Sequence, residues 1–267
     1  MDTVLCCRTR LGASDGSRAG RAKICWARAD FSLKFSTMRG LVTVLVCALF
    51  VVVPAEAGPW ARDDGGFYLR GLVSVESLDG LDGTRADAYG EYGLTDRLTL
   101  TGKTEAVFYE DSIGEIDRQS YRVSLRRQLW SHKGFTFGAE AAAVYGSAIV
   151  GTFGCDEWGG EARVSGGYSG VRKSLGYYLF SDFAMISHQD GCVRRRAEFG
   201  YGADISDRIF VTQQVWLERS NDSADSNKFE SQVGYHFGHF DVAVGYREEF
   251  GGAYEESAYL IALTTRR

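Results

Sequence analysis

From Phe67 almost to its C-terminus, the chain alternates apolar and polar residues with a period of two. This is the period of a β-strand, in which successive side chains point to opposite faces. The clearest segment places Phe240, Val242, Val244, Tyr246 and Phe250 on one face and Asp241, Ala243, Gly245, Arg247 and Glu249 on the other. Segments 121–129, 193–202 and 229–237 alternate in the same way. The chain is therefore predicted to be all-β from Phe67 onward.

Eight further segments follow this pattern less cleanly, near 67–77, 84–94, 98–109, 135–147, 160–169, 174–186, 209–219 and 254–265. Together these segments predict twelve strands, most of them ten to thirteen residues long. Strands of soluble proteins usually have about 5–6 residues, whereas a tilted strand that spans a membrane needs about 9–11. The chain has 33 glycines but only two prolines, Pro54 and Pro59, so no proline interrupts strand pairing after residue 59.

The connections between the predicted strands alternate in length. Tight links are expected at 95–97, 131–134, 170–173, 206–208 and 238–239, and mostly longer links at 78–83, 110–117, 148–159, 187–191 and 220–227, with a short one near 251–252. Short and long loops that alternate along an even number of strands are typical of outer-membrane barrels, with both termini in the periplasm. We therefore predict an up-and-down antiparallel transmembrane β-barrel of about twelve strands.

A secretory signal peptide is predicted at residues 38–57. Met38 and Arg39 precede an apolar run of 13 residues, Leu41–Val53, and Ala55-Glu56-Ala57 follows as a small-x-small cleavage signal. The run is shorter than the about 20 residues that a transmembrane helix needs. Cleavage after Ala57 would release a mature chain of 210 residues, 58–267, which forms the predicted barrel domain.

Residues 1–37 are rich in arginine and show no apolar periodicity. We interpret them as a non-native or disordered N-terminal extension, with translation starting at Met38; an organelle transit peptide is the alternative. Of the 30 Lys and Arg and the 35 Asp and Glu residues of the whole chain, residues 58–267 hold 22 and 31, which gives this part a net charge of −9. So acidic a chain is not expected to bind nucleic acid.

Two segments resemble a family of uncharacterised alphaproteobacterial outer-membrane β-barrel proteins. The first is Gly58-Pro59-Trp60-Ala61-Arg62, followed by Gly65-Gly66-Phe67. The second is Tyr89-Gly90-Glu91-Tyr92-Gly93-Leu94-Thr95-Asp96-Arg97-Leu98-Thr99-Leu100, which carries a strand, a tight turn and the next strand. The matching motifs are structural. The resemblance implies a barrel fold and a place in the bacterial outer membrane, but no activity.

The polar face of such a barrel lines the lumen, because the apolar face meets lipid. The candidate lumen residues are Arg70, Lys103, Glu105, Arg122, Arg126, Arg163, Arg194, Arg196, Glu198, Arg247 and Glu249. Charges at this density either pair across the interior and fill a narrow barrel, or separate into acidic and basic strips beside a water-filled pore. In a soluble barrel such as a lipocalin, the apolar face would instead point inward around an apolar ligand.

These features predict a bacterial outer-membrane protein that forms a narrow passive channel for small polar or anionic solutes. The pairs Arg122/Arg126 and Arg194/Arg196 favour anions, because guanidinium groups bind carboxylates and phosphates. The expected partners are outer-membrane lipids and a small anionic solute; the oligomeric state stays open. The alternatives are a non-conducting structural or partner-binding barrel, a barrel hydrolase and a soluble lipocalin-like binder.

No catalytic, cofactor or metal site is predicted. The four histidines are His132, His188, His236 and His239. No serine lies near His236 on its strand face, and Ser187-His188 has no partner nearby except Asp190. The spacings of His, Cys, Asp and Glu match no recognised metal motif, and the sequence has no glycine-rich phosphate loop.

Cys155 and Cys192 are the two cysteines, of six, that lie outside residues 1–57. They fall in neighbouring loops on the same side of the predicted barrel, and an exported protein enters an oxidising compartment. We therefore predict that they form a disulfide; two free thiols are the alternative.

A thiol titration tests this pairing. The mature protein, denatured without reductant, should show no free thiol, whereas two free thiols would contradict the disulfide. A disulfide across the separation of 37 residues should contribute about 3–4 kcal/mol to the free energy of unfolding. Replacing both cysteines by serine should therefore lower the midpoint of urea denaturation.

Overall fold

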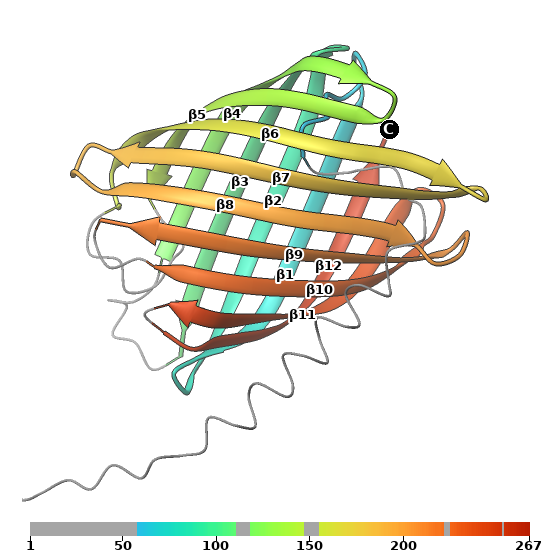
Figure 1. Cartoon of the computed structure of the whole chain (residues 1–267). Helices are drawn as coiled ribbons and strands as arrows, with labels where there is room; N and C mark the ends of the chain where they lie inside the picture. Colours follow the sequence, from blue (N-terminus) through green and yellow to red (C-terminus); the bar gives the residue numbers. More distant parts are fainter. Residues whose placement is uncertain (1–57, 111–117, 147–154, 222–224, 253) are drawn as a thin grey trace, which may run out of the picture. The chain divides into compact units, whose positions relative to one another are not determined.

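The structure, a computed structural model, describes residues 58–110, 118–146, 155–221, 225–252 and 254–267. These residues form twelve antiparallel strands that close into one barrel, which confirms the predicted fold (Figure 1). The strands are β1 (Phe67–Leu78), β2 (Leu81–Thr95), β3 (Leu98–Tyr109), β4 (Arg118–His132), β5 (Phe135–Gly146), β6 (Trp158–Arg172), β7 (Leu175–His188), β8 (Val193–Asp204), β9 (Ile209–Ser220), β10 (Ser226–His236), β11 (Phe240–Gly252) and β12 (Glu256–Arg266). No helix among the described residues is long and apolar enough to cross a membrane. The predicted extension 1–37, the signal peptide 38–57 and its cleavage site lie outside the described residues.

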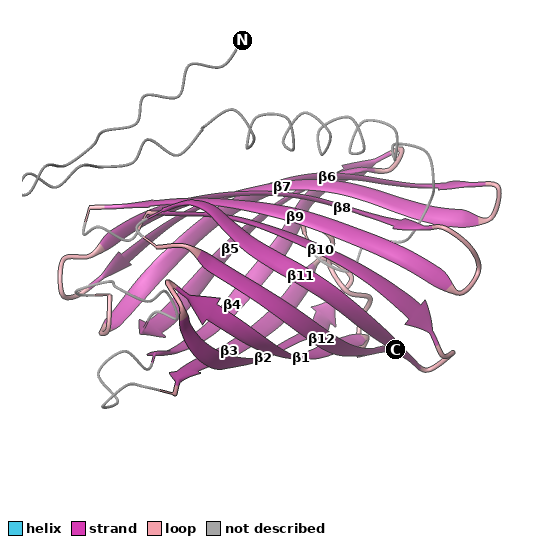
Figure 2. Ribbon diagram, turned by 90° about the horizontal axis from the view of Figure 1, so that it is seen from below, coloured by secondary structure: helices cyan, strands magenta, loops and turns pink. Residues whose placement is uncertain are grey.

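Every strand pairs with its neighbours in sequence, and β1 pairs with β12 to close the sheet. In this closing pair, Val73 lies opposite Ile261. A closed sheet has no edge, so the backbone N–H and C=O groups of the strands find partners within the barrel. Figures 1 and 2 show that β6–β9 and β1–β4 form opposite walls of the barrel. Inward side chains of the two walls therefore face the same interior.

The outward face of the barrel is apolar. The side chains of Val244 and Phe199 are 58% and 42% exposed on this face. Other exposed apolar residues include Leu69, Val73, Val75, Val123, Leu125, Phe137, Val164, Leu179, Phe183, Met185, Val233, Ile261 and Leu263. An apolar surface of this extent suits hydrocarbon rather than water. The soluble lipocalin-like alternative, which places the apolar face inward, is therefore wrong.

The inward face carries many buried charged residues, but it is not wholly polar. In β1, Ser74 and Glu76 are buried, whereas Val73 and Val75 beside them are exposed. Some inward positions are nevertheless apolar. They form two clusters, one of Leu72, Ala243, Leu260 and Ala262 and one of Tyr178 and Phe180, and Phe210 packs against both. Apolar side chains thus occupy part of the interior, which the alternation alone did not predict.

In three of the two-residue hairpin turns, both turn residues have positive φ. Lys133–Gly134 and Lys173–Ser174 lie at one end of the barrel, and Asp79–Gly80 lies at the other. This is the type I′ geometry, whose twist matches that of the flanking strands. The longer link predicted at 78–83 is therefore wrong, because β1 runs to Leu78 and β2 begins at Leu81. The Asp-Gly dipeptide is a strong signal for such a turn.

Cys155 and Cys192 form a disulfide with a Cα–Cα distance of 5.2 Å, which confirms the predicted pairing. Asp190 links the same two segments, because its carboxylate accepts hydrogen bonds from the backbone N–H groups of Asp156 (3.0 Å) and Cys192 (3.1 Å). Burial raises the pKa of Asp190, but these hydrogen bonds outweigh it and hold the pKa below its ordinary value. The connection between β7 and β8 is thus tied to the segment before β6.

A charge on the outward face should cost more stability in the middle of the barrel than near its end. Val244 lies opposite Val233 and Ile261, away from both ends of β11. We expect Val244→Arg to lower the free energy of unfolding in lipid vesicles by about 2–4 kcal/mol, because the bilayer midplane solvates charge poorly. The matched control is Ile209→Arg, at the first position of β9, which should cost about 0–1 kcal/mol. If urea denaturation shows the same loss of unfolding free energy for both variants, the assignment of the outward face to lipid is contradicted.

Candidate functional site

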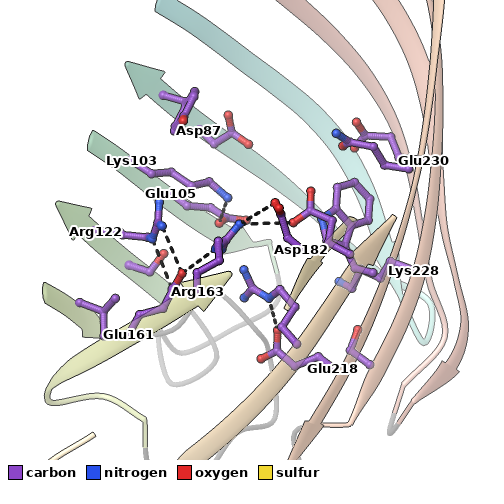
Figure 3. A pocket seen from close by; sticks show the side chains of 18 of the residues that line it. Asp87, Lys103, Glu105, Arg122, Glu161, Arg163, Asp182, Glu218, Lys228 and Glu230 are labelled. Atoms are coloured by element: carbon purple, nitrogen blue, oxygen red, sulfur yellow. Dashed lines mark hydrogen bonds and ion pairs between the residues drawn. The ribbon is translucent and has the colours of Figure 1, made fainter. Parts of the chain in front are cut away.

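The interior of the barrel contains a cavity of about 280 Å³ whose walls are highly charged (Figure 3). Ten of the lining residues are cationic and seven are acidic. The cationic residues are Arg70, Arg85, Lys103, Arg122, Arg126, Arg163, Arg194, Arg196, Lys228 and Arg247, and the acidic residues are Asp87, Glu105, Glu161, Asp182, Glu198, Glu218 and Glu230. Because period-two alternation points these side chains inward from many strands, charges that are distant in sequence meet here.

One network of ion pairs joins β2, β4, β5 and β6. Arg126 of β4 binds Glu91 of β2 (Nη1–Oε1 2.8 Å) and Glu140 of β5 (Nε–Oε2 3.0 Å). Arg122 of β4 also binds Glu140 and reaches Glu161 of β6 (Nη2–Oε1 3.1 Å). Glu140 thus lies between two guanidinium groups. Charges of opposite sign alternate along this wall.

Arg163 of β6 extends this network to β7 and β8. Its guanidinium binds Glu161 (Nε–Oε1 2.9 Å) and Asp182 (Nη1–Oδ2 3.3 Å), as Figure 3 shows. It also lies 3.7 Å from a carboxylate oxygen of Glu198. A single cation therefore connects carboxylates from three strands, and its position depends on all of them.

A second network joins β1, β2, β11 and β12. Glu76 of β1 binds Arg85 (Oε2–Nε 2.8 Å) and Arg247 (Oε2–Nη2 3.2 Å). Glu256 of β12 binds Arg247 (Oε1–Nε 3.1 Å) and lies 3.5 Å from Arg85 (Oε2–Nη2). All four side chains are buried. A buried charge without its partner is strongly destabilising, so these residues depend on one another.

At three ion pairs of the cavity wall the cation is most clearly more exposed than its carboxylate partner. These pairs are Lys103–Glu105, Arg196–Glu218 and Arg70–Glu230. Their cationic side chains are 37%, 25% and 24% exposed, and their carboxylate side chains are 15%, 5% and 5% exposed, in the same order. The cationic groups thus face the cavity, and the carboxylates lie deeper in the wall. An anion in the cavity would meet the cationic groups first.

The structure brings the residues predicted to line the lumen together in the interior. Ten of the eleven line the cavity: Arg70, Lys103, Glu105, Arg122, Arg126, Arg163, Arg194, Arg196, Glu198 and Arg247. The eleventh, Glu249, has a buried side chain whose carboxylate lies 3.4 Å from Nζ of Lys228, another lining residue. These charges alternate in sign and pair with one another. They do not separate into an acidic and a basic strip.

Several members of the networks are absent from the predicted set: Glu76, Arg85, Glu91, Glu218 and Glu256. All of them occupy strand positions whose side chains point inward, so the period-two alternation was sufficient to place them in the interior. In β9 and β12 the signal is weak, because apolar residues such as Phe210, Trp216 and Leu260 share the inward parity with these charges.

The start of the described chain, Gly58–Asp64, enters the barrel; we call it the N-terminal segment. Its first residues are buried, and Asp63 and Asp64 are exposed. Pro59 is fully buried. The backbone N–H of Ala61 donates to Oε1 of Gln128 (3.2 Å), and that of Arg62 donates to Oγ1 of Thr99 (2.9 Å). Both acceptors belong to inward-facing side chains of the barrel wall. Nothing in the sequence pattern predicted that this segment enters the interior.

The histidines considered for catalysis have ordinary structural partners. His236 lies 3.0 Å from Asp204 and 2.6 Å from Asp241 through its two ring nitrogens. Nδ1 of His188 lies 2.9 Å from the backbone carbonyl oxygen of Glu157. Within the described ranges, no group of three or more His, Cys, Asp and Glu side chains is arranged to hold a metal ion.

No protein-family model and no curated protein matches the sequence. Among solved structures, the COG4313 outer membrane channel from Pseudomonas putida F1 is similar, with 11% identity and a TM-score of 0.52 over 81% of this chain and 100% of that one. The NanC porin (10% identity, TM-score 0.53) and the KdgM porin (8%, 0.51) each match over 73% of this chain and 98% of their own. At these identities the likeness concerns the fold. The chain has the fold of outer-membrane β-barrels.

Removing one carboxylate from a buried network should destabilise the barrel. Glu140→Gln takes away the charge that binds Arg122 and Arg126, and we expect it to lower the free energy of unfolding by about 3–5 kcal/mol. The matched control is Asp225→Asn at the pair Arg219–Asp225, whose side chains are about half exposed; it should cost about 0–1 kcal/mol. Urea denaturation in lipid vesicles measures both. A small loss for Glu140→Gln would show that the network does not stabilise the fold.

Proposed function

We propose that this chain is a bacterial outer-membrane protein that forms a narrow passive channel for small anionic solutes. The observation that carries the proposal is the arrangement of the three ion pairs Lys103–Glu105, Arg196–Glu218 and Arg70–Glu230, whose cations face the cavity while their carboxylates lie behind. Lys and Arg present N–H donors that bind carboxylate and phosphate groups.

The size of the cavity supports a small solute. Its volume of about 280 Å³ is at the lower limit of the about 300–1,000 Å³ usual for sites that take drug-sized ligands. Among the structurally similar barrels, the KdgM porin has been solved in complex with disordered oligogalacturonate (8% identity, TM-score 0.50). We infer for this chain only the shared chemistry, an anion that meets cationic side chains inside a barrel.

The location and processing of the chain belong to the same proposal. The apolar outward face supports insertion in the outer membrane and contact with its lipids, because hydrocarbon solvates that face and water does not. The apolar run Leu41–Val53 followed by Ala55-Glu56-Ala57 supports export and cleavage after Ala57. The motifs at Gly58–Phe67 and Tyr89–Leu100 support membership of the alphaproteobacterial family that they resemble.

A non-conducting barrel is the second candidate function. It is favoured by the continuous pairing of charges along the walls and by the N-terminal segment inside the interior. Current through the purified protein in planar lipid bilayers separates the two candidates. A steady ohmic current supports a channel, and the absence of current from protein that migrates as a folded barrel on unheated SDS gels supports the alternative.

Anion preference gives a sharper test of the channel. In a KCl gradient the reversal potential should indicate that chloride passes more easily than potassium, because cations line the cavity. Arg196→Gln should shift the reversal potential towards that of an unselective pore, since Arg196 is among the more exposed cations of the cavity. The matched control, Arg97→Gln in the exposed turn between β2 and β3, removes the same charge outside the barrel and should leave the reversal potential unchanged. Equal shifts for both variants would contradict the assignment.

A further inference from the structure

The N-terminal segment reaches well into the barrel from the end that carries the turns Lys133–Gly134 and Lys173–Ser174. Gly58 lies next to Phe180, which is five residues into β7 from its start at Leu175, and Gly58 also lines the charged cavity. The indole ring of Trp60 lies edge-on to the ring of Tyr178 (6.2 Å between centroids). The segment therefore stands between the cavity and this end of the barrel.

The barrel wall is shaped to receive the segment. Gly167 of β6 faces inward, and a Cβ atom at this position would lie 2.5 Å from Cη2 of Trp60. Gly93 of β2 also faces inward, and a Cβ atom there would overlap the backbone carbonyl oxygen of Asp63. Any larger residue at either position would displace the segment. Glycine at these two inward positions makes the close approach of a second backbone possible.

The segment is also bound by charge. The guanidinium of Arg62 pairs with Glu91 and lies over the ring of Tyr68, 4.8 Å from its centroid. Glu91 binds Arg126 in turn, and the Arg126 guanidinium lies 3.5 Å from the backbone carbonyl oxygen of Trp60. The segment is therefore part of the same ion-pair network that forms the cavity wall. Arg62 and the backbone of Trp60 are its points of attachment.

Apolar side chains also lie between the charged cavity and this end of the barrel. Trp60 and Phe210 both pack against Tyr178 and Phe180. Phe210 also packs against the cluster that contains Leu72. An apolar layer reinforced by Trp60 thus borders the charged cavity, and ions cross apolar constrictions poorly because they lose hydration there.

We propose that the N-terminal segment is an internal plug, which narrows the channel at its periplasmic end and sets its conductance. This proposal rests on the proposed channel function. Cleavage after Ala57 would make Gly58 the first residue, so its α-ammonium group would add a cation at the wall of the cavity. The occupant of this part of the interior is thus the mature N-terminus of the chain itself.

Single-channel recording in planar bilayers tests the plug with two variants. One lacks residues 58–62, and the other, Trp60→Ala, keeps the backbone of the segment but removes the side chain that fills the space beside Gly167 and Tyr178. We expect a severalfold larger conductance for the deletion and an intermediate increase for Trp60→Ala. The matched control is Trp130→Ala, which removes an outward-facing indole that is 54% exposed and should leave the conductance unchanged. Heat-dependent migration on SDS gels shows that each variant is folded, and Trp60→Ala decides the test if the deletion does not fold.

The outcomes separate the two proposals. Conductance that rises in the plug variants but not in Trp130→Ala supports the plug. Equal conductance in the wild type and both plug variants overturns the plug and leaves the channel standing. If the folded wild type and the folded plug variants all pass no current, both proposals are overturned, because the interior would then be closed without any contribution from the segment.

Discussion

Backbone hydrogen bonding in a medium without water is the constraint on which this structure depends. Hydrocarbon offers no partner to N–H and C=O groups, so strands can cross a membrane only as a sheet that closes on itself. The pairing of β1 with β12 supplies this closure. Once the sheet is closed, each residue faces either lipid or interior, and a shift of one residue would exchange the two faces of a strand. The exposed Val244 and the buried Ala243 beside it show how sharply the two environments differ.

The arrangement of the interior reflects a related cost, that of removing charged side chains from water. Inward charges are removed from bulk water, and they are stable there because they bind one another. Arg163 and Arg126 each bind carboxylates on more than one strand, so the networks also hold the walls in register. The more exposed cations, such as Lys103, lie over carboxylates that are buried behind them. In this way a barrel whose residues 58–267 carry a net charge of −9 presents cationic groups to the space that a solute would enter.

Much of the fold can be predicted from the sequence, because lipid and lumen impose opposite polarities on neighbouring residues. The twelve strands follow from the period of two, and the disulfide Cys155–Cys192 follows from the placement of two cysteines. The orientation of the strand faces follows from strand number, strand length and the alternation of short and long loops, because the period alone fits either orientation. Residues such as Arg122 are placed in the interior by parity alone. The period says nothing, however, about which charge pairs with which. Arg122 and Glu161 are 39 residues apart and meet only because β4 and β6 both flank β5 in the sheet. It also fails where apolar residues such as Phe180 take inward positions, because they pack against a segment that no strand pattern reveals.

The central claim is that the apolar side chains face lipid and the charged ones face the interior. Spin labels placed singly at successive positions of β11, from Val242 to Tyr246, test it in protein reconstituted into lipid vesicles. Oxygen concentrates in hydrocarbon, and a polar nickel complex stays in water, so the two relaxing agents distinguish the faces. The account predicts that labels at 242, 244 and 246 respond to oxygen and that those at 243 and 245 do not. The opposite parity, or equal responses at all five positions, would contradict it.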